Sequence, residues 1–453
     1  MLAISLLLTP FMERASAAAD SSFYLKNGDR VCFYGDSITE QRYYGADVET
    51  YVRTRFPDLK VKFVNSGVGG DKVSGGWAGP IDLRLKRDVF PFKPNVVTIM
   101  LGMNDGKYQA FDQQIFADYT NGYEHIIQSL QQHLPGVRIV VIEPTPYDDV
   151  TEAPKFPGGY NAVMLRYSEF VRQLAAEHHL MCVDFMTTLV NVMEKAQSQD
   201  PKLAHDVIPG RVHPSAVGEL VMAQSLLQAW NAPSTVTAVA IDAAKNAVVK
   251  SDNTSVSDLK NSDDKISWMQ DDKSLPFPIL GLHENWPQFP PTENNKWGKA
   301  SFFWPAPQPK WDYTNASAEM IVNDSGFNQA LNHQPLQVSG LQTGNYELKI
   351  NGQLVGEFSD RQLSDGINLA VYDTPMLEQS YQVLAQVWKQ IQWRFFAWRD
   401  IQIRLMGDRD PKVQKAADSL VAALEAQKQK IVNQQYVAAH PQPTHYQLIR
   451  LAD

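Results

Sequence analysis

The chain has 453 residues, too many for a single hydrophobic core of ordinary size, so its length predicts two or three domains. Hydrophobic residues make up 44% of the sequence and charged residues 20%, a balance that is ordinary for a globular protein and excludes wholesale disorder. The net charge is −9 and no run of Lys or Arg stands out, which argues against nucleic acid as a main partner.

The first part of the chain combines an apolar stretch, from Met1 to Pro10, with small residues near Ala17 and Ala19. This pattern is typical of a secretory signal, although the basic residues that usually precede the apolar stretch are missing. We expect residues 1–19 to be a signal peptide and the protein to be exported (periplasmic or extracellular), the alternative being a frayed apolar tail. No later stretch has about 18 consecutive apolar residues, so no membrane span is expected.

Residues 24–232 alternate between strand and helix patterns. The predicted strands are 30–34, 61–65, 96–101, 138–143 and 180–185, and the predicted helices are 46–56, 79–88, 115–133, 160–179 and 215–230. This alternation predicts an α/β fold, a parallel sheet with helices on both faces. Ligands bind such sheets beyond the carboxyl ends of the strands, so residues that follow each strand are candidate site residues. The two cysteines, Cys32 and Cys182, fall in strands, and we expect both to be buried free thiols.

The first strand stops abruptly on Gly35-Asp36-Ser37. A serine at the start of a helix after a strand exposes its hydroxyl, and its backbone N–H points outward with the helix dipole behind it. That placement suits a nucleophile that must stabilise an oxyanion as it attacks. Taken alone, the same residues are an ordinary helix cap.

Three further segments favour the nucleophile over the helix cap. Asn65-Ser66-Gly67-Val68-Gly69-Gly70-Asp71 follows the second strand, Gly102-Met103-Asn104-Asp105-Gly106 follows the third, and Gly210-Arg211-Val212-His213-Pro214 comes later. With the segment at Ser37, these motifs in this order resemble the SGNH (GDSL-type) hydrolase family over about residues 24–232. The resemblance implies a flavodoxin-like, doubly wound parallel sheet of five strands.

The resemblance also implies a role for one residue in each motif. Ser37 matches the nucleophile and His213 the general base that takes its proton, because a serine hydroxyl is a weak nucleophile without a base. The backbone N–H groups of Ser37 and Gly70 and the side-chain amide of Asn104 match the three donors of an oxyanion hole, each worth roughly 3–4 kcal/mol in the transition state. A side chain at position 70 would crowd the acyl group.

One motif departs from the family pattern. The family has Asp-x-x-His, and an Asp three residues before the histidine could hold the imidazole Nδ1. Here that position is Gly210. The substitute could be a main-chain carbonyl, which we favour, a carboxylate from elsewhere, or no group at all. Asp206 is the nearest acid, but Pro209 interrupts any helix between it and His213.

From about residue 233 the pattern changes, and residues 233–453 are predicted to form an accessory α+β domain. Strands are expected within 236–249, at 267–269 and at 336–341, a β-hairpin at 346–358 with Asn351-Gly352 as its turn, and long helices over 374–436. The segment 275–311 is rich in Trp and Pro. We favour the interpretation that it packs irregular chain onto a domain interface, over a carbohydrate-binding lid.

No His-Glu-x-x-His or Cys-x-x-Cys pattern occurs, so neither a metal nor another cofactor is expected. The leading hypothesis is a serine esterase that hydrolyses small acyl esters, acetyl above all, on a small-molecule or carbohydrate substrate. Two alternatives stay open: a lipase or lysophospholipase-type acylhydrolase, and a degenerate SGNH domain that binds glycans without turnover.

Overall fold

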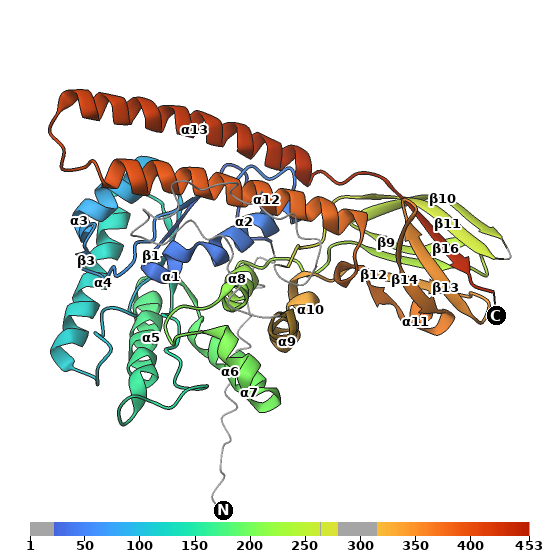
Figure 1. Cartoon of the computed structure of the whole chain (residues 1–453), viewed down its shortest axis with the longest axis horizontal. Helices are drawn as coiled ribbons and strands as arrows, with labels where there is room; N and C mark the ends of the chain where they lie inside the picture. The colour runs from blue at the N-terminus through green and yellow to red at the C-terminus, as the bar shows by residue number, and fades with distance from the viewer. Residues whose placement is uncertain (1–21, 263, 280–314, 453) are drawn as a thin grey trace, which may run out of the picture.

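The computed structural model describes residues 22–262, 264–279 and 315–452 (Figure 1). The predicted signal peptide at 1–19 and residues 280–311 of the Trp- and Pro-rich segment lie outside the described residues. Within these ranges, no helix combines the length and the apolar character that a membrane crossing requires.

The first half of the chain builds a five-stranded sheet in the order β2-β1-β5-β6-β7, with every neighbouring pair parallel. Its strands are β1 (Arg30–Gly35), β2 (Lys62–Asn65), β5 (Val96–Met100), β6 (Arg138–Ile142) and β7 (Met181–Val183). The strands β1 and β5 are almost wholly buried, as expected for apolar strands that helices cover on both faces. The predicted α/β fold and its flavodoxin-like strand order are confirmed.

Helices connect these strands. They are α1 (Ser37–Gln41), α2 (Tyr43–Arg55), α3 (Ile81–Arg84), α4 (Gln113–His133), α5 (Gly159–Glu177), α6 (Met186–Gln199), α7 (Pro201–Ala204) and α8 (Ala216–Ala229). The sequence did not predict α6 and α7, and α3 continues as a π-helical turn over Leu85–Val89. A short hairpin, β3 (Gly75–Gly76) and β4 (Gly79–Pro80), precedes α3.

The second half contains two further sheets. One is antiparallel, in the order β10 (Thr254–Ser262), β11 (Lys265–Asp272), β16 (Thr444–Arg450), β13 (Asn345–Ile350) and β14 (Gln353–Ser359). The other has the order β15 (Ile367–Asn368), β12 (Pro335–Ser339), β8 (Ala238–Asp242) and β9 (Ala247–Asp252). Both sheets contribute to one core, with Val239 and Val338 from one and Trp268 and Leu348 from the other. The predicted hairpin is confirmed, since β13 and β14 are joined at Asn351-Gly352.

The remaining helices return to the first half of the chain. Phe277, together with α9 (Asn315–Ser325) and α10 (Phe327–Leu331), adds side chains to the core of the five-stranded sheet. The long helices α12 (Pro375–Phe395) and α13 (Pro411–Ala439) extend across the same part of the molecule, as Figure 1 shows, and α11 (Asp360–Asp365) stays beside β12. The chain therefore crosses between its two halves several times, and the division into domains at 24–232 and 233–453 stays a prediction.

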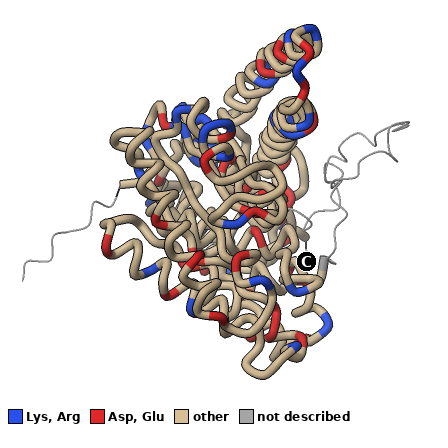
Figure 2. The backbone as a smooth tube through the Cα atoms, turned by 90° about the vertical axis from the view of Figure 1, so that its left-hand side faces the viewer, with Lys and Arg blue, Asp and Glu red and all other residues tan. Residues whose placement is uncertain are grey.

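The polar residues of α2 explain why α12 and α13 lie there. Glu49 and Arg53 on α2 are buried and paired with each other at 2.8 Å. Arg53 also donates to Gln435 of α13, and Gln390 of α12 donates to Glu49. Buried charges need such partners, so α2 depends on the two C-terminal helices. Elsewhere, Lys and Arg are interspersed with Asp and Glu over the face drawn in Figure 2.

The two cysteines are free, as predicted. Cys32 is buried in β1, whereas Cys182 in β7 is only half-buried, which corrects the expectation that both are buried. Burial raises the pKa of each thiol to about 12, so neither is a ready nucleophile.

Candidate active site

Ser37 is the first residue of α1 and follows the carboxyl end of β1 by two positions. Asp36 caps this short helix, because its carboxylate accepts the backbone N–H of Ile38 at 3.0 Å. The Ser37 Oγ lies 2.8 Å from Nε2 of His213, although the two residues are 176 positions apart in the chain. The pairing of serine and histidine that the motifs predicted is therefore present as a contact.

His213 lies on the loop that leads into α8, whose first turn is capped by Ser215. Two consecutive residues before it, Gly210 and Arg211, have left-handed backbones with φ of 72° and 74°. Burial lowers the pKa of His213, so the imidazole is neutral at neutral pH and able to accept a proton. Which group orients Nδ1 stays a prediction.

The loop after β2 passes close to Ser37. A Cβ built on Gly69 would lie 3.8 Å from the Cβ of Ser37 and only 2.8 Å from a carboxylate oxygen of Glu40. At Gly70 a Cβ would meet no atom of the protein, but φ there is +78°, a conformation that glycine adopts without strain. The tight position is thus Gly69, and Gly70 is required by its backbone conformation.

Asn104 follows β5 and is joined to the loop after β2. Its Nδ2 donates to the backbone carbonyl of Asp71 at 3.1 Å, which ties it to the residue after Gly70. Tyr108 donates its hydroxyl to Oδ1 of Asn104 at 2.9 Å, and so fixes which end of the amide carries the N–H groups. Tyr108 itself packs against the rings of Tyr147 and Tyr160.

Buried charges lie beneath these donors. Arg84 pairs with Asp71 at 2.7 Å and with Asp88, and also donates to the carbonyl of Ser66. All three charged side chains are fully buried. Burial also raises the pKa of Asp36 to about 7. The part of the site around Gly70 and Asn104, called the oxyanion side after the role that the resemblance predicts for them, therefore rests on an ion-pair network that solvent does not reach.

The loop of His213 is held differently, by Arg211. Its guanidinium donates to the carbonyl of Asp148 at 3.0 Å and pairs with Asp149 at 3.2 Å and with Glu152 at 2.7 Å. Its own carbonyl accepts the backbone N–H of Asp148 at 2.9 Å. These contacts bind the loop that follows β6 to the loop that carries His213.

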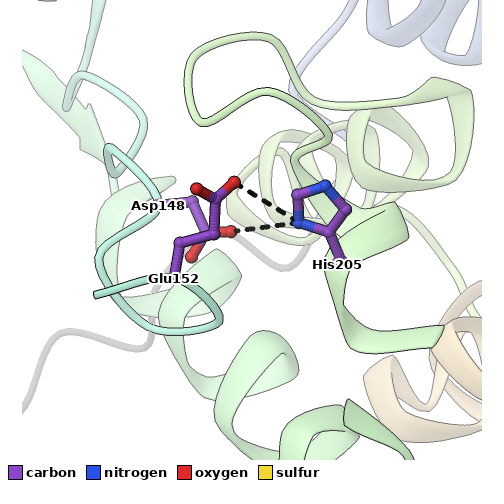
Figure 3. A group of neighbouring side chains, drawn as sticks. All are labelled: Asp148, Glu152 and His205. Carbon is purple, nitrogen blue, oxygen red and sulfur yellow. Dashed lines mark ion pairs between the residues drawn. The ribbon is translucent and has the colours of Figure 1, made fainter. Parts of the chain in front are cut away.

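A histidine joins this cluster. Asp148 and Glu152 both turn a carboxylate toward Nδ1 of His205, at 3.9 and 3.7 Å (Figure 3). The three side chains are near enough to hold a cation. However, Asp148 already accepts hydrogen bonds from the backbone N–H groups of Val150 and Thr151, and Arg211 neutralises Glu152. We interpret the group as an ion-pair network.

The structure thus places all four predicted site residues at the carboxyl edge of β2, β1 and β5 or on the loop beside them. Ser37 and His213 are in contact, and Asn104 is bonded to the residue next to Gly70. Sequence reasoning missed Tyr108 and gave Arg211 no role. No motif marks either residue, because their roles depend on neighbours 4 and about 60 positions away.

Comparison with known proteins agrees with this geometry. Residues 33–220 match the model of the GDSL-like Lipase/Acylhydrolase family. An acetylxylan esterase of Geobacillus stearothermophilus is 27% identical over 221 residues, which cover 45% of this chain and 94% of that protein.

Solved structures extend the likeness. The structure described as BT4096, a gut microbial diltiazem-metabolizing enzyme, matches with a TM-score of 0.76 at 24% identity, over 95% of this chain and 99% of that one. The structure of Axe2, an acetylxylan esterase from Geobacillus stearothermophilus, matches with a TM-score of 0.38 at 23% identity, over 46% of this chain and 96% of that one.

The fold and the matched motifs define an α/β hydrolytic enzyme of the SGNH class. Residues 33–220 are thus similar to the GDSL-like (SGNH) hydrolases, and the protein is a carboxylic ester hydrolase.

Proposed function

We propose that the protein is a serine esterase that removes small acyl groups, acetyl above all, from carbohydrate esters by means of Ser37 and His213. The observation that carries the proposal is the 2.8 Å contact between Ser37 Oγ and His213 Nε2, with Gly70 and Asn104 on the adjoining loops. The likeness to a protein named acetylxylan esterase supports acetyl as the acyl group.

In the first half of the reaction, Ser37 Oγ attacks the ester carbonyl carbon while Nε2 of His213 takes the hydroxyl proton. The negative charge moves to the carbonyl oxygen, where the N–H groups of Ser37, Gly70 and Asn104 stabilise it. The carbonyl then re-forms, the bond to the alcohol oxygen breaks, and His213 gives its proton to that oxygen. An acyl-serine remains.

In the second half, water replaces the alcohol. His213 takes a proton from the water as its oxygen attacks the acyl carbon, and the same donors stabilise the second oxyanion. Collapse breaks the bond to Ser37, whose oxygen recovers the proton from His213. The products are the carboxylic acid, the alcohol and the original enzyme.

The site also supports a short acyl chain. The ring of Tyr108 lies beside Asn104 and packs on Tyr147 and Tyr160, so aromatic side chains crowd the oxyanion side. A long chain would have to pass these rings, whereas an acetyl group would not.

The test is hydrolysis of p-nitrophenyl esters of increasing acyl length by the wild type and by Ser37→Ala. We expect turnover of the acetate that falls as the acyl chain lengthens, and none above background in the variant. Equal rates for the two proteins would overturn the catalytic assignment. Rates that rise toward long chains would leave the enzyme in place and favour the acylhydrolase alternative.

We further propose that the protein acts after export, on the strength of the apolar stretch and small residues in 1–19. Mass spectrometry of the protein from its native host checks this: a mature N-terminus near residue 18 or 20 is expected, and an intact N-terminus at Met1 would contradict it.

A further inference from the structure

The C-terminal half of the chain reaches the site through the π-helical segment Phe396–Ile403, which follows α12. Trp398 and Ile403 of this segment form a small buried cluster with Val68 and Ala78. Val68 lies two residues before Gly70, and Ala78 lies at the tip of the β3–β4 hairpin. The loop that carries the second oxyanion donor therefore has part of its hydrophobic support in residues almost 330 positions away.

Arg399, the next residue of the same segment, closes a ring of contacts. Its guanidinium pairs with Glu40 at 2.8 Å, and the other carboxylate oxygen of Glu40 accepts the N–H of Gly69 at 2.6 Å. The carbonyl of Gly69 accepts the indole N–H of Trp77 at 2.9 Å. The Arg399 guanidinium in turn lies over the ring of Trp77, with Cζ 4.2 Å from the centroid of the ring.

This ring of contacts fixes a large aromatic side chain on the loop that passes close to Ser37. Both the indole N–H and the π-face of Trp77 have partners, so its orientation is determined, yet 54% of the residue stays exposed. Arg399 is buried, with only 6% of its side chain exposed. A buried cation that holds an exposed aromatic residue costs desolvation, and packing alone does not explain it.

Trp77 is joined to the loop that passes close to Ser37. Its hydrogen-bond partner Gly69 is the residue whose Cβ would lie 3.8 Å from the Cβ of Ser37. Asn104 and Tyr108 occupy the loop after β5, whereas Trp77 is held on the loop and hairpin after β2. A flat indole suits a pyranose ring better than it suits an alkyl chain, because the C–H groups on one side of the rigid chair form an apolar face that can lie on the indole.

We propose that Trp77, fixed by Arg399 of the C-terminal segment, is the platform on which the sugar ring of an acetylated carbohydrate stacks while its ester reaches Ser37. The proposal rests on the proposed function and adds a role for the second half of the chain: Trp77 sets specificity, and Arg399 is its positioning residue.

The experiment compares two acetates, a peracetylated methyl xyloside and ethyl acetate, which has no ring. The measured quantity is the kcat/KM for the xyloside divided by the kcat/KM for ethyl acetate. Trp77→Ala should lower this ratio about ten- to a hundredfold, the usual range for loss of one aromatic stacking contact. The loss should fall mainly on KM for the xyloside, since stacking holds substrate and transition state alike. Trp77→Tyr should restore most of the ratio.

Variants of the C-terminal segment test the link. Arg399→Lys keeps a positive charge opposite Glu40 but removes the planar guanidinium, so it should lower the same ratio several-fold. Phe396→Ala, at an exposed residue of the same segment, is the control and should leave the ratio as in wild type. Arg399→Lys behaving like Phe396→Ala would overturn the positioning role.

Other outcomes separate this proposal from the one it rests on. If Trp77→Ala lowered kcat equally for both acetates, Trp77 would only support the oxyanion loop and the platform would be overturned. A wild-type ratio no higher than that of Trp77→Ala would exclude a sugar as the ligand. Loss of the proposed function itself is recognised independently, by Ser37→Ala retaining full activity on ethyl acetate.

Discussion

Gly70 and Asn104 are supported by ion pairs that are wholly buried, whereas the loop of His213 is held by ion pairs that are partly exposed. On the oxyanion side, Arg84 and its two carboxylate partners are inaccessible, and Trp398 of the C-terminal segment donates to Asp88 at 2.7 Å. On the histidine side, the side chains of Arg211, Asp149 and Glu152 are 11%, 7% and 35% exposed.

This difference in burial fits the different chemical tasks of the oxyanion donors and the general base. Oxyanion donors stabilise charge only if they are already in place when it develops, so rigid, buried support favours them. A general base must accept a proton and release it twice in each turnover. Support from a partly exposed ion-pair network permits small adjustments of His213, and two left-handed residues set the path of its loop.

The largest difference between the two sides should appear in stability. Arg84→Met would leave Asp71 fully buried without its ion-pair partner and Asp88 with Arg87 alone, so we expect a loss of about 3–5 kcal/mol in the free energy of unfolding. Arg211→Met leaves Glu152, which is 35% exposed, in contact with water and Asp149, which is 7% exposed, near it, so it should cost only about 1–2 kcal/mol. Urea denaturation measures both. Similar losses of unfolding free energy for the two variants would contradict the difference between the two sides. Combining Arg84→Met with Asp71→Asn removes the charge that is left unpaired and should recover part of the stability that Arg84→Met loses.

The next effect concerns catalysis on the oxyanion side. Asn104→Ala removes a donor used mainly in the transition state, so kcat for p-nitrophenyl acetate should fall by about 10²–10³ with little change in KM. Tyr108→Phe removes the hydroxyl that orients the amide and should lower kcat by less than about tenfold. An effect of Asn104→Ala that appears only in KM would show that Asn104 binds substrate and is not an oxyanion donor.

Local patterns made the first half of the molecule predictable. The strands of the five-stranded sheet are short apolar runs that end on motif residues, and the order of those motifs gave the fold. The helix α6 was missed, although Leu189, Val192, Met193 and Ala196 are buried on one face. The mainly polar and exposed strand β10 was missed because its pairing with β11 is decided by neighbours and not by its own residues.

Contacts between distant segments could not be predicted. Glu40 and Arg399 are 359 positions apart, and each looks like an ordinary surface charge in the sequence. The same holds for the hydrogen bond between Trp398 and Asp88. Four candidate site residues could be predicted from motifs because each motif is local, whereas the residues that support them come from segments that only the folded chain brings together.

Gly210 offers a test of the histidine side. Its φ of +72° is a conformation that Asp and Asn tolerate better than other residues, and a Cβ there meets no atom within 4 Å. Gly210→Asp should raise kcat modestly, by less than about a hundredfold, over the isosteric control Gly210→Asn, which lacks the charge. A gain of several thousandfold would mean that nothing orients His213 in the natural protein. No gain, together with a crystal structure that shows another carboxylate on Nδ1 of His213, would mean that a carboxylate already fills this role.

The smallest expected effect is a shift in pH dependence. Burial lowers the pKa of His213 below the ordinary value of about 6.5, so the imidazole stays neutral, and able to act as a base, down to a lower pH than a free histidine. The acid limb of kcat/KM reports the base of the free enzyme, and we expect its midpoint below about 6.5. In Gly210→Asp a carboxylate near His213 would favour the imidazolium and move this midpoint upward, whereas Gly210→Asn should leave it in place. A midpoint above about 6.5 in the wild type would show that an anionic group already outweighs burial at His213, and the histidine side would then resemble the oxyanion side in having a charged support of its own.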